Sequence, residues 1–496
     1  MTQAALTTQK TILRETQNRT TQTPAVVKTA GVSYTPKRMN VRLYNTLSRQ
    51  VETVEPIESG KIGMYSCGPT VYWFAHIGNM RAFLFSDLLH RVFRQQGLEV
   101  RLVMNVTDVG HLVGDGDEGD DKMLVAMRRE GKTAYDIAEF YTQAFFKDLE
   151  ALGILRATEY PRATQHIAEQ IQMIVQLEKN GATYRTRDGI YFDTATLPEY
   201  GRLSGQRSEE KLAGARVEMG DKRNPTDFAL WKFAPEGVER EMIWPSPWGE
   251  GFPGWHIECS AMSKKYLGVP FDVHTGGVDH IAVHHENEIA QTLGADGVLE
   301  ANLWAHSEFL TVDGGKMSKS LGNVYTIQDL VNRGYDPLAY RYFVLAGHYR
   351  SKINFTWEAM DGAQNALRKV RETVQGWSQP STPSEEYLTR FFEAVNNDLK
   401  TSEALAVLWD LIGNQELSTE VKSATILVFD RVLGLGLASV VATPTEVSAD
   451  IQKLIAARDA ARAEKNWAES DRLREEISSK GFVVKDTPSG TQVVKV

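Results

Sequence analysis

The chain has 496 residues, a hydrophobic fraction of 42%, a charged fraction of 24% and a formal net charge of −9. This length is too great for one hydrophobic core, so we expect several domains of ordinary globular composition. There is no run of about eighteen apolar residues, which excludes a membrane-spanning helix, and the overall acidity argues against indiscriminate binding to nucleic acid.

Only two cysteines occur, Cys67 and Cys259, and the first residues lack a hydrophobic signal core. We therefore expect a cytoplasmic protein whose thiols stay reduced. If both thiols have a role, a shared metal ion is the leading candidate.

Residues 1–40 are rich in Thr and Gln, show no hydrophobic period, and carry six basic residues against one acidic residue. This composition predicts a disordered basic tail. An organellar transit peptide is the alternative, because such peptides are also poor in acidic residues.

Residues 41–182 predict the first half of a nucleotide-binding domain. A short strand at 62–66 is followed by a glycine-containing loop, and then by a helix over about 80–96 whose apolar stripe stops at Gly97. A second short strand is expected at 99–106. Strand, loop, helix and strand make a βαβ unit, the start of a Rossmann-type parallel sheet.

The remainder predicts an insertion in that sheet and then largely helical units. We expect a turn-rich connective insertion at 183–250, the second half of the sheet at 251–310, and a loop and junction at 311–360. Apolar spacing at 361–440 suits a helical bundle, and 446–496 reads as two helices followed by two short strands. Helical units behind a nucleotide domain suggest a large second substrate.

Two segments suit phosphate chemistry. The loop His76-Ile-Gly78-Asn79 stands where a strand meets a helix, so a helix N-terminus can face phosphate. Taken alone, a core or capping histidine explains His76 better. The string Lys316-Met-Ser-Lys319-Ser320 suits a loop that brings cations to a reacting phosphate. A bare K-x-x-K would be a solvated loop, but the five-residue string is far more specific.

Together these segments resemble the HIGH and KMSKS signatures of class I aminoacyl-tRNA synthetases, and they occur in the expected order. No Walker A motif or G-x-G-x-x-G fingerprint competes for the nucleotide site. The resemblance implies an α/β fold: a class I synthetase Rossmann-type parallel sheet with an insertion, followed by an all-α bundle and a small α/β C-terminal domain.

A third set of residues has metal-binding chemistry. His284 and Glu288 are four residues apart, so on a helix they share one face. With Cys67 and Cys259 they would complete a tetrahedral set of two thiolates, one imidazole and one carboxylate. The two cysteines are far apart in the sequence, so the residues alone leave a zinc site and unrelated buried side chains equally open.

The strings CGPTVY, GWHIECSAM and HHENEIAQ resemble the zinc-ligand segments of the cysteinyl-tRNA synthetase family, and the likeness runs from about residue 41 to the C-terminus. It implies one Zn²⁺ held by Cys67, Cys259, His284 and Glu288, to which the substrate cysteine adds its thiolate. It also implies L-cysteine, ATP with Mg²⁺ and tRNA(Cys) as substrates, a C-terminal anticodon-binding domain at 446–496, and a monomer.

The same resemblance implies roles for other positions. His76, Gly78, Asn79, Gly277, Asp279 and Lys319 would bind ATP; His76, Asn79, Lys316 and Lys319 would act in catalysis; Thr70, Trp255 and His256 would bind cysteine. Two positions depart from the family pattern: Trp73 stands where an acidic residue is more frequent, and 397–405 follows the bundle motif only loosely.

Three other functions are considered. A ligase joining cysteine to an amino sugar shares the core and zinc set but does not need residues 385–496. A non-catalytic RNA-binding relative should have lost His76, Lys316 and Lys319. A zinc hydrolase needs a metal that activates water, for which two thiolates are poor ligands. The acidic stretch after Asp115 fails as a calcium loop, because Ala126 stands where a bidentate Glu is required.

Overall fold

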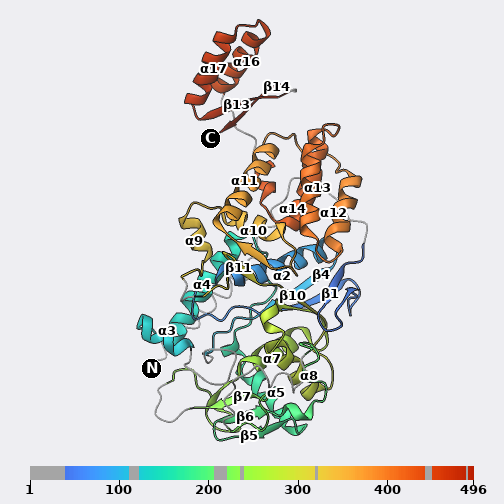
Figure 1. Cartoon of the computed structure of the whole chain (residues 1–496), viewed down its shortest axis with the longest axis vertical. Helices are drawn as coiled ribbons and strands as arrows, with labels where there is room; N and C mark the ends of the chain where they lie inside the picture. Colours follow the sequence, from blue (N-terminus) through green and yellow to red (C-terminus); the bar gives the residue numbers. More distant parts are fainter. Residues whose placement is uncertain are drawn as a thin grey trace, which may run out of the picture.

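The structure is a computed structural model that describes residues 39–110, 122–205, 221–234, 240–318, 322–441, 449–487 and 490–495. Most of the predicted basic tail and the stretch after Asp115 therefore lie outside the described residues, as do Lys319 and Ser320. Figure 1 shows an elongated molecule, with the small C-terminal unit at one end and the insertion at the other.

Four parallel strands form the central sheet in the order β10–β9–β3–β4. The strands are β3 (Lys61–Ser66), β4 (Glu99–Met104), β9 (Phe271–Gly277) and β10 (Ala301–Ser307). β3 pairs with β4 on one side and with β9 on the other. The order of strands therefore reverses between β3 and β9, and ligands of open parallel sheets bind at the carboxyl ends of such neighbours.

Helix α2 (Ile77–Gln95) connects β3 to β4, as the βαβ pattern predicts. It begins at Ile77 rather than at Met80, because His76 caps it. The His76 side chain accepts a hydrogen bond from the Asn79 backbone N–H, and the Asn79 side chain accepts one from the His76 backbone. This reciprocal pair satisfies two backbone donors that a helix start leaves open.

Between the two halves of the sheet the chain forms an intervening segment of helices and short strands. It comprises α3 (Lys122–Glu130), α4 (Ala134–Ala151), α5 (Ile167–Lys179), β5 (Thr183–Arg185), β6 (Gly189–Phe192), β7 (Phe228–Phe233) and β8 (Gly251–Pro253). The four strands form an antiparallel sheet in the order β5–β6–β7–β8. Helices α7 (Trp255–Leu267) and α8 (His284–Asp296) then flank β9 in the sequence.

Two small strand pairs support the central sheet. β1 (Arg42–Asn45) and β2 (Gln50–Thr53) form an antiparallel hairpin beside β10, and β11 (Leu310–Val312) pairs in parallel with β12 (Ile353–Phe355). Helices α9 (Ile327–Asn332) and α10 (Pro337–Ala346) lie between β11 and β12 in the sequence. The pair β11–β12 thereby brings the segment after residue 312 to the cleft described below.

The last third of the chain is helical. Its helices are α11 (Trp357–Val374), α12 (Glu385–Asn396), α13 (Thr401–Gly413), α14 (Thr419–Leu433), α15 (Leu437–Val441), α16 (Ala449–Ala463) and α17 (Trp467–Ser479). The hairpin of β13 (Phe482–Thr487) and β14 (Gly490–Lys495) follows, as the sequence predicts. Among the described residues, no helix is both long and apolar enough to cross a lipid bilayer.

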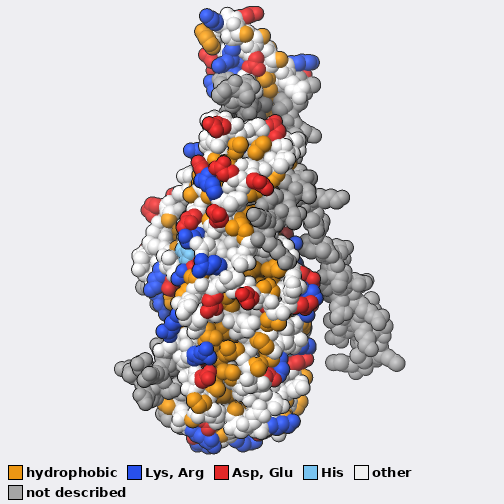
Figure 2. Space-filling model, turned by 90° about the vertical axis from the view of Figure 1, so that its right-hand side faces the viewer, with side chains coloured by type: hydrophobic (Ala, Val, Ile, Leu, Met, Phe, Trp, Pro, Cys, Tyr) orange, Lys and Arg blue, Asp and Glu red, His pale blue; other side chains and the backbone are white. Residues whose placement is uncertain are grey.

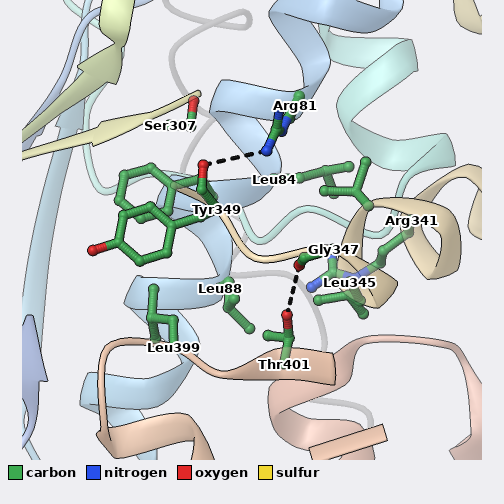
Figure 3. A pocket seen from close by; sticks show the side chains of 12 residues that line it. Arg81, Leu84, Leu88, Ser307, Arg341, Leu345, Gly347, Tyr349, Leu399 and Thr401 are labelled. Atoms are coloured by element: carbon green, nitrogen blue, oxygen red, sulfur yellow. Dashed lines mark hydrogen bonds between the residues drawn. The ribbon is translucent and has the colours of Figure 1, made fainter. Parts of the chain in front are cut away.

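The sheet and the helical bundle are joined through α2 (Figure 3). Arg81 of α2 is buried and donates hydrogen bonds to the backbone carbonyls of His348 and Tyr349, while Thr401 donates to the carbonyl of Gly347. These contacts surround a small cavity of about 20 Å³, enough for about one water molecule.

On the face shown in Figure 2, hydrophobic side chains gather over the middle and lower part of the molecule.

Candidate active site and metal cluster

A cleft of about 500 Å³ opens at the carboxyl ends of β3 and β9. Residues from both predicted phosphate-binding segments and from the predicted metal-ligand set line it together. They include Cys67, Thr70, His76, Gly78, Asn79, Trp255, Gly277, Asp279, Lys316 and Met317. Nine of the predicted site residues therefore face one cavity, although they come from segments far apart in the chain.

The N-terminus of α2 forms one wall of the cleft. His76 both caps the helix and lines the cleft, so the capping role does not remove it from the cavity. Gly78 has a further role that the sequence did not indicate. A Cβ added there would lie 2.3 Å from Cε of Met317. The missing side chain thus lets the Lys316–Ser318 segment pack directly against α2.

The segment that carries Lys316 lines the cleft next to the start of α2. Its backbone is held by Asn323, whose side chain accepts from the Ser318 N–H at 2.8 Å and donates to the Lys316 carbonyl at 3.2 Å. The Gly314 N–H donates to Asn354 at 2.7 Å. These bonds fix the backbone and leave the Lys316 side chain exposed at the cleft. Lys319 belongs to the part of the chain that is not described.

The four predicted metal ligands lie together in the interior. One ligand atom each from Cys67, Cys259, His284 and Glu288 can be chosen so that all lie within 4.8 Å of one another, and all four residues are buried. Cys67 follows β3 directly, Cys259 lies on α7, and the other two occupy the first two turns of α8. The i, i+4 spacing does place His284 and Glu288 on one face, with Nε2 and Oε1 2.9 Å apart.

The separations suit a tetrahedral zinc ion. The two sulfur atoms are 3.9 Å apart, far beyond a disulfide bond and close to the about 3.8 Å that two Zn–S bonds of about 2.3 Å give at tetrahedral angles. Cys67 Sγ lies 3.8 Å from Glu288 Oε1. Two soft thiolates with one imidazole and one carboxylate make a donor set that zinc accepts.

Charge within the cluster is arranged around Glu288. Burial opposes its ionisation, but His274 and His284 overcome this effect and lower the pKa of the Glu288 carboxyl. Burial raises the pKa of the Cys67 thiol well above its usual range, and the neighbouring sulfur of Cys259 adds to the effect. An ionised carboxylate buried beside thiols, whose ionisation a nearby positive charge would favour, makes the space between them suitable for a cation.

A second group of ligand atoms, from Cys67, His274, His285 and Glu288, is equally compact. The hydrogen bonds give His274 and His285 supporting positions. His274 Nε2 lies 2.9 Å from Glu288 Oε2, which leaves Oε1 toward Cys67 and His284. His285 Nε2 lies 3.3 Å from Cys67 Sγ. Partners of this kind orient metal ligands and tune their basicity.

His285 is the end of a chain of polar side chains. Its Nδ1 lies 2.7 Å from His306 Nε2, and His306 Nδ1 lies 2.7 Å from the Thr46 hydroxyl. A thiolate only accepts hydrogen bonds. With Cys67 ionised, His285 must therefore donate to the sulfur, His306 must donate to His285, and the Thr46 hydroxyl must donate to His306. Burial holds the pKa values of His285 and His306 well below their usual range, which keeps both rings neutral as this order requires.

Trp255 and His256 occupy different places. Trp255 lines the cleft, and its ring centroid lies 4.7 Å from that of His284. His256 is buried behind His284, with the two Nδ1 atoms 2.8 Å apart, and does not line the cleft. Thr70 lines the cleft and is held beside Thr107 by a backbone bridge.

Comparison with known families explains this arrangement. Residues 53–365 match the family described as "tRNA synthetases class I (C) catalytic domain", and residues 445–493 match "Cysteinyl-tRNA ligase anticodon binding domain". The chain belongs to the cysteine–tRNA ligase family. Its members are ligases that form aminoacyl-tRNA, and the second match separates the chain from a ligase that acts on an amino sugar.

Individual relatives agree along almost the whole length. A cysteine–tRNA ligase of Burkholderia lata is 52% identical over 456 residues, which cover 92% of this chain and 97% of the relative. One from Treponema denticola is 41% identical and covers 91% and 99%. Two solved class I synthetases share the fold at low identity. The Agrobacterium radiobacter LeuRS–tRNA–LeuAMS ternary complex has a TM-score of 0.56 at 12% identity, and the match covers 79% of this chain and 86% of that one. Mycobacterium tuberculosis methionyl-tRNA synthetase has a TM-score of 0.50 at 16% identity, and the match covers 80% of this chain and 94% of that one.

Proposed function

We propose that this chain activates L-cysteine with ATP to give cysteinyl-AMP and pyrophosphate, and then transfers the cysteinyl group to the 3′-terminal adenosine of tRNA(Cys). The enzyme acts as a monomer in the cytoplasm. One zinc ion held by Cys67, Cys259, His284 and Glu288 selects the amino acid, and ATP enters with Mg²⁺.

The observation that carries the proposal is the position of the four clustered side chains that could hold a metal ion. Cys67 belongs to the cluster and also lines the cleft that holds His76, Asn79 and Lys316. An amino acid with its side chain toward Cys67 would thus have its carboxylate within the cavity that receives ATP. Family membership supports the reaction, and this geometry supports the means of selection.

The proposed selection rests on sulfur chemistry. Serine differs from cysteine only by oxygen in place of sulfur, a contrast that apolar packing separates poorly. Zinc, when bound, supplies a borderline-soft cation that prefers a thiolate to a hydroxyl. The ligands are buried, which keeps bulk water away from them, and the ring of Trp255 lies beside His284 at the side of the cleft.

The other residues would position and stabilise phosphate. The N-terminus of α2 and the residues His76 and Asn79 line the cleft, where the helix dipole favours negative charge. Gly277 and Asp279 lie at the end of β9 on the same cavity, in reach of the nucleoside part. Lys316, with Lys319, would neutralise charge that develops on the reacting phosphate. No covalent intermediate with the protein is required.

A direct test is ATP–pyrophosphate exchange driven by cysteine or by serine, with bound zinc measured on the same samples. The Cys259→Ser variant should lose zinc and lose most of its preference for cysteine. Ser260→Ala is the matched control, because Ser260 is equally buried on α7 but bonds to Gln291 instead of the cluster. If Cys259→Ser rejects serine as well as the parent does, the zinc account is wrong.

A further inference from the structure

A group of aromatic side chains lies at the edge of the cleft, where α4 meets the segment before α2. Trp73, Phe74 and Tyr141 line the cleft itself, and Phe140 continues the group onto the surface. Phe74 and Phe140 are 38% and 48% exposed. In Figure 1, α3 and α4 lie on the left-hand side of the sheet domain.

The rings contact one another in a continuous path. Phe74 lies 4.9 Å from Tyr141 and 6.1 Å from Phe140 between ring centroids, both in edge-to-face arrangement. Trp73 lies 5.9 Å from Phe74 and from Tyr141. Edge-to-face contacts within the group leave ring faces turned in several directions, which suits the stacking of flat groups from outside.

Core packing explains Tyr141, which belongs to the buried face of α4, but not the exposure of Phe74 and Phe140. On α4 the buried face carries Ile137, Tyr141 and Phe145, and Phe140 lies outside that stripe. Phe74 and Phe140, whose rings are in contact, leave apolar surface exposed to water. Such surface beside a cleft marks a place where something binds.

Positive charge accompanies the rings. The Arg129 guanidinium lies 3.8 Å over the Trp73 ring, and the Lys132 ammonium lies 4.8 Å from the Phe140 ring. Glu130 pairs with both cations, at 2.7 Å and 3.5 Å. Residues 122–133 nevertheless contain four basic residues and one acidic residue, in a chain whose net charge is −9. The partner should therefore offer both π faces and negative charge.

We infer that this aromatic group, the exposed rings of Phe74 and Phe140 with Trp73 and Tyr141 beside them, receives the unpaired nucleotides at the 3′ end of tRNA. The inference rests on the proposed function, because the terminal ribose of tRNA must then enter this cleft. Unpaired bases stack on exposed aromatic side chains with little regard to sequence, and nearby cations hold their phosphates. The surface is continuous with the cavity in which the transfer step would take place.

The test compares binding of two RNAs, a full-length tRNA(Cys) transcript and the same transcript lacking its three 3′-terminal nucleotides. Phe140→Ala should weaken binding of the full-length RNA by about tenfold, within the range for one stacked base, and leave the shortened RNA unchanged. Phe140→Tyr, which keeps the ring, should bind as the parent does. Ile57→Ala removes an equally exposed apolar side chain at the opposite end of the sheet strands and should change neither affinity.

Cysteine-dependent ATP–pyrophosphate exchange, measured without RNA, keeps the two proposals apart. The inference expects Phe140→Ala to retain the parent's exchange rate and melting temperature. Equal binding of full-length RNA by Phe140→Ala and the parent overturns the inference, as does an equal loss for both RNAs. A parent protein that catalyses no exchange overturns the proposed function instead, and with it the occupant assigned to this surface.

Discussion

The two sides of the cleft are built in opposite ways. The cluster of Cys67, Cys259, His284 and Glu288 is buried and comes from the end of β3 and two helices. The segment of Lys316 is exposed, and only its backbone is fixed, through Asn323 and Asn354. The side that would recognise the amino acid is complete before any substrate arrives, whereas the lysine side chain can still move.

Because of this difference, we expect one side to contribute to the free energy of substrate binding and the other to the activation free energy. A rigid, dehydrated cluster can discriminate between ligands in the ground state, because its atoms need not rearrange to bind. An exposed cation that reaches the phosphate only during the reaction contributes to the rate rather than to binding. Substitutions on the two sides should therefore affect different measured quantities.

The largest effect is expected from the removal of a metal ligand. Cys67→Ala should abolish zinc binding. Loss of a residue that only supports a metal ligand lowers activity by up to about 100-fold, so loss of the ligand itself should lower kcat/KM for cysteine activation by more than that. Metal analysis and pyrophosphate exchange would measure both quantities. Retention of one zinc per chain in this variant would contradict the assignment of Cys67.

Lys316→Ala should act on the rate alone. We expect kcat for cysteine activation to fall by about 10²–10³-fold, as for other groups that stabilise transition-state charge, while the zinc content and the KM for cysteine stay unchanged. Lys352→Ala is the control, because Lys352 is also exposed near β12 but does not line the cleft. A raised KM with an unchanged kcat would place Lys316 in ground-state binding.

The histidine chain should affect the metal more than the reaction. His285→Ala removes the ring that contacts Cys67 Sγ at 3.3 Å, and zinc affinity should fall by about 10- to 100-fold. Competition with a chelator measures this directly. His166→Ala is the control, since His166 is buried and hydrogen-bonded elsewhere, to Arg162 and Tyr266. Equal zinc affinities in the two variants would remove the supporting role.

The smallest effect is expected at Gly78. Gly78→Ala places a methyl group against the end of the flexible Met317 side chain, which can move at small cost. We expect kcat to fall a few-fold, and the double variant with Met317→Ala to recover it. A loss in Gly78→Ala that the double variant does not recover would show that the contact with Met317 is not the cause.

Local parts of this structure were predictable from the sequence. The apolar stripe after Met80 and the stop at Gly97 predict α2 and the βαβ unit, and the cap by His76 explains the earlier start. The i, i+4 pair of His284 and Glu288 is likewise a property of the helix itself. Each of these features depends on neighbours within a few residues, so periodicity and capping rules suffice.

The convergence of the site was not predictable from residues alone. Cys67 and Cys259 are separated by 192 positions, and only the path of the whole chain brings them together; resemblance to a family supplied that link. His274, His285 and His306 were missed for the same reason. A signal did exist, because His274 and His306 lie in strands that are otherwise almost continuously buried, where a histidine requires a polar partner.

The most direct test of the central claim is X-ray absorption at the zinc edge of the purified protein, with and without L-cysteine. The proposed ligand set predicts two sulfur neighbours for the metal in the free protein and three after cysteine is added, with serine causing no change. Fewer than two sulfur neighbours in the free protein, or the same number with and without cysteine, would contradict the account.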